Sequence, residues 1–170
     1  TGAVIETERV TIGDRDTAWR LAKRLDRPGL ALMVRCARAL SAGAELVGVA
    51  QDDALATSAP LPDEQLLSID WTRPADEIVR LVRAAAPYPG ASAELGDELV
   101  EILEATAYAR ALPRVLEPCD AVWTPEGLVV RAGDRGVLVH TARDADGALR
   151  RGEGLSQLFP EPLARLFFAP

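Results

Sequence analysis

Hydrophobic positions in the first 50 residues predict short strands on either side of a helical region. Residues 4–12 are rich in β-branched side chains and predict an extended strand that ends at Gly13. Residues 46–49 predict a second short strand. We expect both to be pieces of a larger sheet, so that their apolar faces are exposed in this chain.

Between these strands, apolar residues recur at helical spacing. The candidate N-caps of a first helix are Asp14, Asp16 and Thr17. The sequence "DRPG" at 26–29 is expected to break that helix, because proline disfavours a helix interior. A second helix is predicted over residues 30–42, where the apolar residues form one stripe.

The stretch "IDWTRPADEIVRLVRAAAPYPGA", residues 69–91, combines an Asp-Trp pair, an amphipathic helix and a Pro-aromatic-Pro-Gly turn. The helix is predicted over residues 74–86, with acidic side chains in its first turn and arginines later, as the helix dipole favours. Its buried stripe is predicted to comprise Ile78, Leu81, Val82 and Ala85. Residues 50–65 have the composition of a surface linker, so we interpret the stretch as a joint between two domains, packed by Trp71 and Tyr88.

After the joint, the hydrophobic period changes to two residues, which predicts strands. The predicted strands cover residues 99–105, 128–132 and 137–141, and one of the turns between them is "GDRG" at 133–136. A short helix is predicted over residues 154–159. We interpret this half of the chain as a small all-β unit, consistent with a small barrel.

Composition and charge disfavour several functional classes. The 170 residues, 48% hydrophobic and 26% charged, suffice for the core of one domain or of two small ones. An apolar run of about 18 residues and a leader peptide are both lacking, so we expect a cytoplasmic protein without membrane contact. The net charge is −7, and residues 61–105 hold three basic and ten acidic side chains, which disfavours a nucleic-acid partner. Cys36 and Cys119 lie far apart without a CxxC pattern, so two reduced thiols are expected.

No catalytic or metal-binding constellation is evident from the residue types. His140, the sole histidine, lies in an alternating strand and is expected on its surface rather than as a general base. Asp52 and Asp53 lie in the linker and are expected to be solvated rather than to bind a metal. Glu101 and Glu104 are expected on opposite faces of a strand, so they form no carboxylate dyad.

The stretch at residues 69–91 resembles the segment of the methionyl-tRNA formyltransferase family that joins the catalytic domain to the C-terminal domain. Three other stretches agree in order and spacing: "TGAVIETERVTIGDRDTAWRLAKRL" resembles the end of the catalytic domain, "AQDDALATSAP" the linker, and "VVRAGDRGVLVHTA" a barrel hairpin. The resemblance implies an α/β remnant of a doubly wound formyltransferase domain plus a small OB-like C-terminal β-barrel. The implied parts are 1–60, the end of the catalytic domain with its linker, then 61–86, a linker helix, and 87–170, the OB-like domain.

The family transfers a formyl group from 10-formyltetrahydrofolate to an amine, a one-carbon reaction. Its catalytic Asn, His and Asp precede the region that this chain resembles, so the resemblance implies no catalytic residue here. The chain alone is expected to be inactive, and an N-terminal catalytic segment is its expected partner. Thr1 and Gly2 would border the active site and the folate, whereas Asp70, Trp71 and Tyr88 would lie at the domain joint.

The resemblance leaves two classes of acceptor amine: tRNA and small molecules. In family members that act on tRNA, the C-terminal barrel helps to bind the acceptor stem and should be basic. Residues 87–170 carry eight arginines and thirteen acidic residues, so we expect a small-molecule amine instead: an amino sugar, a hydroxyornithine or a carrier-bound amino acid. Initiator tRNA is the alternative acceptor. A non-catalytic interaction or scaffold domain is the alternative from a different functional class.

Overall fold

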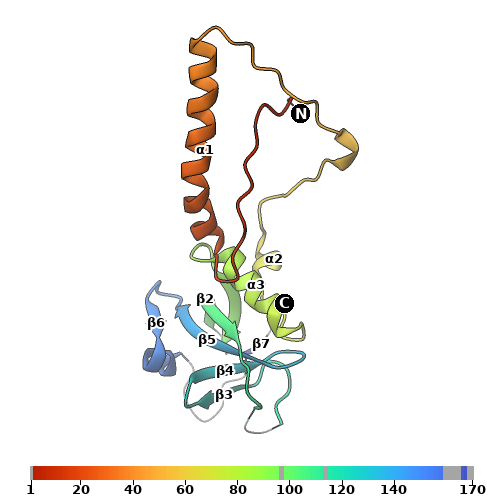
Figure 1. The fold of residues 1–170 in the computed structure, drawn as a ribbon. Coiled ribbons are helices and arrows are strands. Elements are labelled where there is room, and N and C mark those ends of the chain that lie inside the picture. The colour runs from red at the N-terminus through yellow and green to blue at the C-terminus, as the bar shows by residue number, and fades with distance from the viewer. Residues whose placement is uncertain (1, 96–97, 113–114, 159–165, 168–170) are drawn as a thin grey trace. The chain divides into compact units, whose positions relative to one another are not determined.

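The computed structural model of the chain is shown in Figure 1. The residues that it describes are 2–95, 98–112, 115–158 and 166–167. They belong to two compact units, Thr1–Leu61 and Pro62–Pro170. The first unit holds the longest helix, and the second holds the sheet.

The first unit is built around helix α1, Ala18–Ser41, followed by the short 3-10 helix η1, Asp53–Leu55. The side-chain oxygen of Thr17 caps α1 by accepting a hydrogen bond from the backbone N–H of Arg20 at 3.2 Å. The predicted break at "DRPG" was wrong, because α1 continues through Pro28. Proline removes one backbone donor from the helix. No residue of α1 is buried, so water can satisfy the carbonyl that loses its partner.

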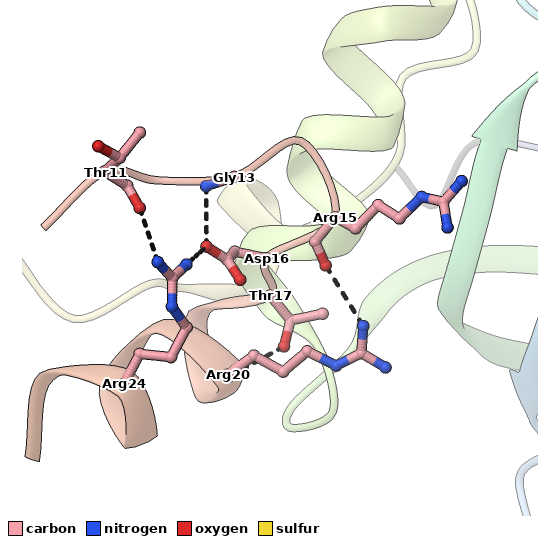
Figure 2. A network of polar contacts seen from close by, with 7 residues as sticks. All are labelled: Thr11, Gly13, Arg15, Asp16, Thr17, Arg20 and Arg24. Carbon is pink, nitrogen blue, oxygen red and sulfur yellow. Dashed lines mark hydrogen bonds and ion pairs between the residues drawn. The ribbon is translucent and has the colours of Figure 1, made fainter.

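A polar network fixes the turn that precedes α1 (Figure 2). The carboxylate of Asp16 accepts a hydrogen bond from the backbone N–H of Gly13 at 2.8 Å and forms an ion pair with Arg24. Arg24 also donates to the carbonyl oxygen of Thr11 at 3.1 Å. One carboxylate and one guanidinium therefore join the extended segment, the turn and the first part of the helix.

The strands predicted for residues 4–12 and 46–49 do not form among the described residues of this unit. A single antiparallel bridge pairs Val4 with Val49, through two backbone hydrogen bonds of 2.9 Å. The prediction was wrong because a strand needs neighbours that continue its hydrogen bonds, and these segments pair at one position only. Ile12 is 67% exposed, in line with the expected open apolar faces, and the doubly wound sheet remains a prediction.

The second unit is an antiparallel sheet. Its strands are β1 Ala91–Leu95, β2 Glu98–Ala107, β3 Ala121–Thr124, β4 Gly127–Arg131, β5 Gly136–Arg143, β6 Leu149–Arg151 and β7 Leu166–Phe167. Their order is β3-β4-β5-β2-β1-β7, and β6 pairs with β5. The three predicted strands correspond to β2, β4 and β5. Among the described residues no pairing joins β3 to β7, so an OB-like closed barrel remains a prediction.

Helices complete this unit: α2, Glu64–Leu67, α3, Ala75–Ala85, and the 3-10 helix η2, Gly152–Gln157. Helix α3 packs against β2 and buries four side chains, namely Ala75, Ile78, Val82 and Ala85 (Figure 1). This confirms the predicted helix and most of its stripe, and Leu81 is partly buried against the same core. The helix predicted at 154–159 begins earlier as η2, and its last residue lies outside the described residues.

Candidate functional site

The residues expected to border an active site lie in the first unit. Thr1 is outside the described residues. Gly2 is exposed, and its carbonyl oxygen accepts a hydrogen bond from the side-chain amide of Gln51 at 2.7 Å. This contact joins the same two segments as the bridge between Val4 and Val49. A role for Thr1 and Gly2 beside a folate remains a prediction.

Asp70 and Trp71 lie in a tight loop just before α3. One carboxylate oxygen of Asp70 accepts hydrogen bonds from the backbone N–H of Thr72 at 2.9 Å and from its hydroxyl at 2.6 Å. The carbonyl oxygen of Asp70 accepts a third, from the backbone N–H of Arg73 at 3.1 Å. An Asp side chain that bonds the backbone two residues on is typical of a turn. The loop leaves Asp70 exposed while Trp71 is fully buried.

Trp71 is buried for its bulk rather than for a hydrogen bond. Its side chain is 0% exposed and belongs to the core shared by α3 and the sheet. Within the described part of the chain, its indole Nε1 has no hydrogen-bond partner. A buried donor without a partner is destabilising, so the favourable contribution of Trp71 comes from packing. Trp71 therefore packs in the core of the second unit, and its place at a joint between two domains remains a prediction.

Tyr88 lies in the Pro-Tyr-Pro-Gly turn at the other end of α3. The guanidinium of Arg143 holds this turn by donating to the carbonyl oxygen of Pro87 at 2.7 Å while it pairs with Glu101. Tyr88 itself is 82% exposed, so it does not pack within the second unit, and its expected place at the joint remains a prediction. Helix α3 has 11 residues, which corresponds to about 16 Å between the two loops at 1.5 Å per residue. Trp71 and Tyr88 therefore do not line one site.

Cys119 lies near Asp70 and is held in an unusual backbone conformation. Its φ is 78°, and its backbone N–H donates to the carbonyl oxygen of Arg131 at 3.0 Å. The pKa of the Cys119 thiol is raised to about 11, chiefly by burial and in addition by the carboxylates of Asp70 and Asp120. The thiol is therefore protonated at neutral pH and is a poor nucleophile. Both cysteines are free, as the spacing predicts.

The remaining candidates have structural partners. Nε2 of His140, which is half-buried on β5, lies 2.8 Å from the hydroxyl of Thr106. Asp52 caps η1 by accepting a hydrogen bond from the backbone N–H of Ala54 at 2.9 Å. Glu104 accepts a hydrogen bond at 3.2 Å from Thr141, whereas Glu101 pairs with Arg143, so the two glutamates have separate partners.

Neither a metal site nor a membrane-spanning helix is supported by the part of the chain that the structure describes. No group of three or more His, Cys, Asp or Glu side chains there is arranged to hold a metal ion. Even α1, with 24 residues, is not apolar enough to cross a lipid bilayer, and neither is any other described helix.

The sequence did not reveal the residue that caps α3. Pro74 stands at the N-cap position and provides no side-chain hydrogen bond. Instead, the carboxylate of Asp134, in the turn between β4 and β5, accepts a hydrogen bond from the backbone N–H of Ala75 at 2.7 Å. This hydrogen bond is the main reason that the pKa of Asp134 is lowered from its ordinary value. A proline at an N-cap leaves helix donors without a local partner, which is a signal for a distant cap.

Residues 63–153 match the family described as "Formyl transferase, C-terminal domain". Methionyl-tRNA formyltransferase of Anaeromyxobacter dehalogenans is 37% identical over 161 residues, which cover 91% of this chain and 51% of that protein. The enzyme of the same name from Paraburkholderia phymatum is 36% identical over 135 residues, with 79% and 41% covered. The chain thus spans about half the length of these relatives, or less.

Two solved structures have a fold similar to that of this chain. HypX from Aquifex aeolicus in complex with tetrahydrofolic acid has a TM-score of 0.58 and 17% identity, over 74% of this chain and 23% of HypX. A HypX variant gives a TM-score of 0.57 over 74% of this chain and 24% of HypX. At this identity the likeness concerns the fold alone. The family match covers more than half of the 170 residues and includes α2, the joint and strands β1 to β6. This chain therefore belongs to the formyltransferase family, as a C-terminal portion of one of its members.

Proposed function

We propose that this chain is the C-terminal portion of a methionyl-tRNA formyltransferase, which formylates the amino group of methionyl initiator tRNA. The observation that carries this proposal is the 37% identity over 161 residues to an enzyme of that name. The alignment covers 91% of the chain and thus includes residues from both units. This acceptor replaces the small-molecule amine that the charge balance favours.

In the proposed reaction, the neutral amine of the acceptor attacks the formyl carbon of 10-formyltetrahydrofolate. A carbon–nitrogen bond to the acceptor forms, the bond from the formyl carbon to the folate nitrogen breaks, and the amine proton ends on that nitrogen. Such a reaction needs a group to move the proton and donors to stabilise the oxyanion. The family resemblance puts these groups on an N-terminal catalytic segment. The tetrahydrofolic acid bound to HypX supports a folate donor.

An open apolar face on α1 supports an N-terminal partner for the first unit. Leu30, Met33 and Leu40 recur at helical spacing and are 62%, 70% and 58% exposed. Such a stripe is normally covered in a folded protein. The relatives are about twice as long as the part of them that this chain matches. In the proposed enzyme, the catalytic segment from the remaining half covers this face.

A small-molecule amine is the second candidate acceptor, favoured by the ion pairs of the second unit. Arg143 pairs with Glu101, and Arg150 pairs with Asp144 at 2.8 Å. The exposed Arg110 is paired as well, with Glu126. Each pair reduces the positive charge that is available to phosphate groups, and a small amine needs no such charge.

Binding of initiator tRNA to this chain tests the acceptor. We expect filter-bound complexes with methionyl initiator tRNA at low salt, with an affinity that falls linearly on a log–log plot between about 50 and 200 mM salt. An elongator tRNA charged with another amino acid, used as competitor, is the control for specificity. If the chain retains no tRNA at the lowest salt, the small-molecule candidate becomes the better one.

A further inference from the structure

The tip of the β4–β5 hairpin, residues 133–135, contacts the segment that leads into α3. The backbone N–H of Gly133 donates to the carbonyl oxygen of Arg73 at 2.9 Å. The carboxylate of Asp134 caps Ala75 at 2.7 Å. The guanidinium of Arg135 forms an ion pair with Asp76. Three consecutive residues of one turn thus bind three positions at the start of another element, and we call residues 133–135 the hairpin clasp.

Gly133 allows the hairpin clasp to come this close. A Cβ atom at position 133 would lie 2.1 Å from the carbonyl oxygen of Thr72 and 2.9 Å from its carbonyl carbon. These are backbone atoms, so a side chain could be accommodated only if one of the two loops moved. Trp71, which precedes Thr72, is fully buried and resists such a movement. Glycine is therefore required here for close backbone approach.

The contacts of the hairpin clasp differ in kind from those that hold the rest of α3. The body of the helix is attached by buried apolar side chains, of which Ile78 and Val82 are 2% and 0% exposed. Its first turn buries only the small side chain of Ala75 and depends in addition on the carboxylate of Asp134, which also suits the positive end of the helix dipole. The ion pair between Arg135 and Asp76 is exposed and adds little. Polar, solvent-accessible contacts of this kind break in local opening events more readily than a core does.

We propose that the hairpin clasp is a conformational latch of the joint. When it opens, the backbone of residues 72–76 loses its contacts with the hairpin, whereas the buried side chains of Trp71 and Ala75 stay in the core and β2, β4 and β5 stay paired. The backbone of residues 72–76 therefore opens as one local unit, with a free energy below that of unfolding the sheet. The linker enters the second unit before this loop, where the backbone N–H of Ile69 donates to the carbonyl oxygen of Ser92 at 2.8 Å. The latch therefore governs the segment between this fixed point and the body of α3.

Amide hydrogen exchange of the 170-residue chain, measured on peptides by mass spectrometry, tests this latch. Asp134→Ala removes the cap, and we expect roughly tenfold faster exchange over residues 72–78, as a lost N-cap implies. Peptides from β2 and β5 should change less than about twofold, because the sheet does not open in this event. Asp134→Asn keeps an oxygen acceptor of similar capping strength and should stay close to the wild type.

Asp146→Ala is the matched control, because Asp146 lies exposed in the turn between β5 and β6. It should leave exchange over residues 72–78 unchanged. Unchanged exchange of that segment in Asp134→Ala would overturn the latch, and so would an equal acceleration in β2 and β5. If Asp134→Ala does not fold, Arg135→Gln serves instead, with an expected acceleration of roughly twofold in the same segment and the same criteria.

Discussion

Trp71→Ala is expected to lower the free energy of unfolding of the second unit by about 3–5 kcal/mol, the range measured for large aromatic residues truncated in a core. Trp71 is 0% exposed and lies in the core between α3 and the sheet. Truncation removes its buried surface and leaves a cavity that the neighbouring strands cannot readily fill. Urea unfolding followed by far-UV circular dichroism measures the change without relying on tryptophan fluorescence.

Two variants sharpen this prediction. Trp71→Phe keeps most of the bulk and removes an indole N–H that has no partner among the described residues, so its cost should be well below that of alanine. Trp19→Ala, at a position 56% exposed in the first unit, should leave the second unit unchanged. A loss of less than about 1 kcal/mol for Trp71→Ala, typical of surface sites, would contradict the packing role of this residue.

Val82→Asp is expected to destabilise the second unit by about 4 kcal/mol or more at neutral pH, since it introduces an unpaired charge into the core. Val82 is 0% exposed on the face of α3 that packs against β2. Ala84→Asp is the matched control, because Ala84 lies on the exposed side of the same helix. Its cost should be within about 0.5 kcal/mol, as for most surface substitutions.

The penalty of Val82→Asp should also depend on pH in a defined direction. Burial raises the pKa of the new carboxyl group above its value in the unfolded chain. The penalty is therefore full above the folded-state pKa and decreases as the pH falls through it, because the folded state then binds the proton more strongly. Urea titrations of both aspartate variants over the same pH range isolate this effect. A difference between the two variants that does not vary with pH would contradict the burial of position 82.

The sequence predicted those elements in which the local residue pattern and the tertiary packing favour the same structure. Helix α3 was predicted at 74–86 and spans Ala75–Ala85, because its apolar spacing and the flanking prolines give the same answer. Strand β1, Ala91–Leu95, was missed because its alanines and serine carry little strand propensity. It forms because β2 pairs with it along its whole length. The helix through Pro28 was missed because proline was treated as a stop, although an exposed helix can continue past it.

The joint was predicted less completely than the helix within it. The buried position of Trp71 follows from its place before an amphipathic helix, but the exposure of Tyr88 does not. Arg143 holds the turn that contains Tyr88 from a strand 56 residues further along the chain. Asp134 caps α3 from 59 residues away. The sequence identifies "GDRG" as a turn, but only the tertiary structure shows which helix end that turn approaches.

The most direct measurement is formyl transfer by the protein that carries this chain together with its catalytic segment. The purified enzyme is given 10-formyltetrahydrofolate with a labelled formyl group and methionyl initiator tRNA. A panel of amino sugars and hydroxyornithine serves as the competing acceptor class. We expect the label on the methionyl amino group of the tRNA, and we expect that the small amines do not compete. Label on a small amine with none on the tRNA would contradict the proposed acceptor, and no transfer to any amine would contradict the proposed reaction.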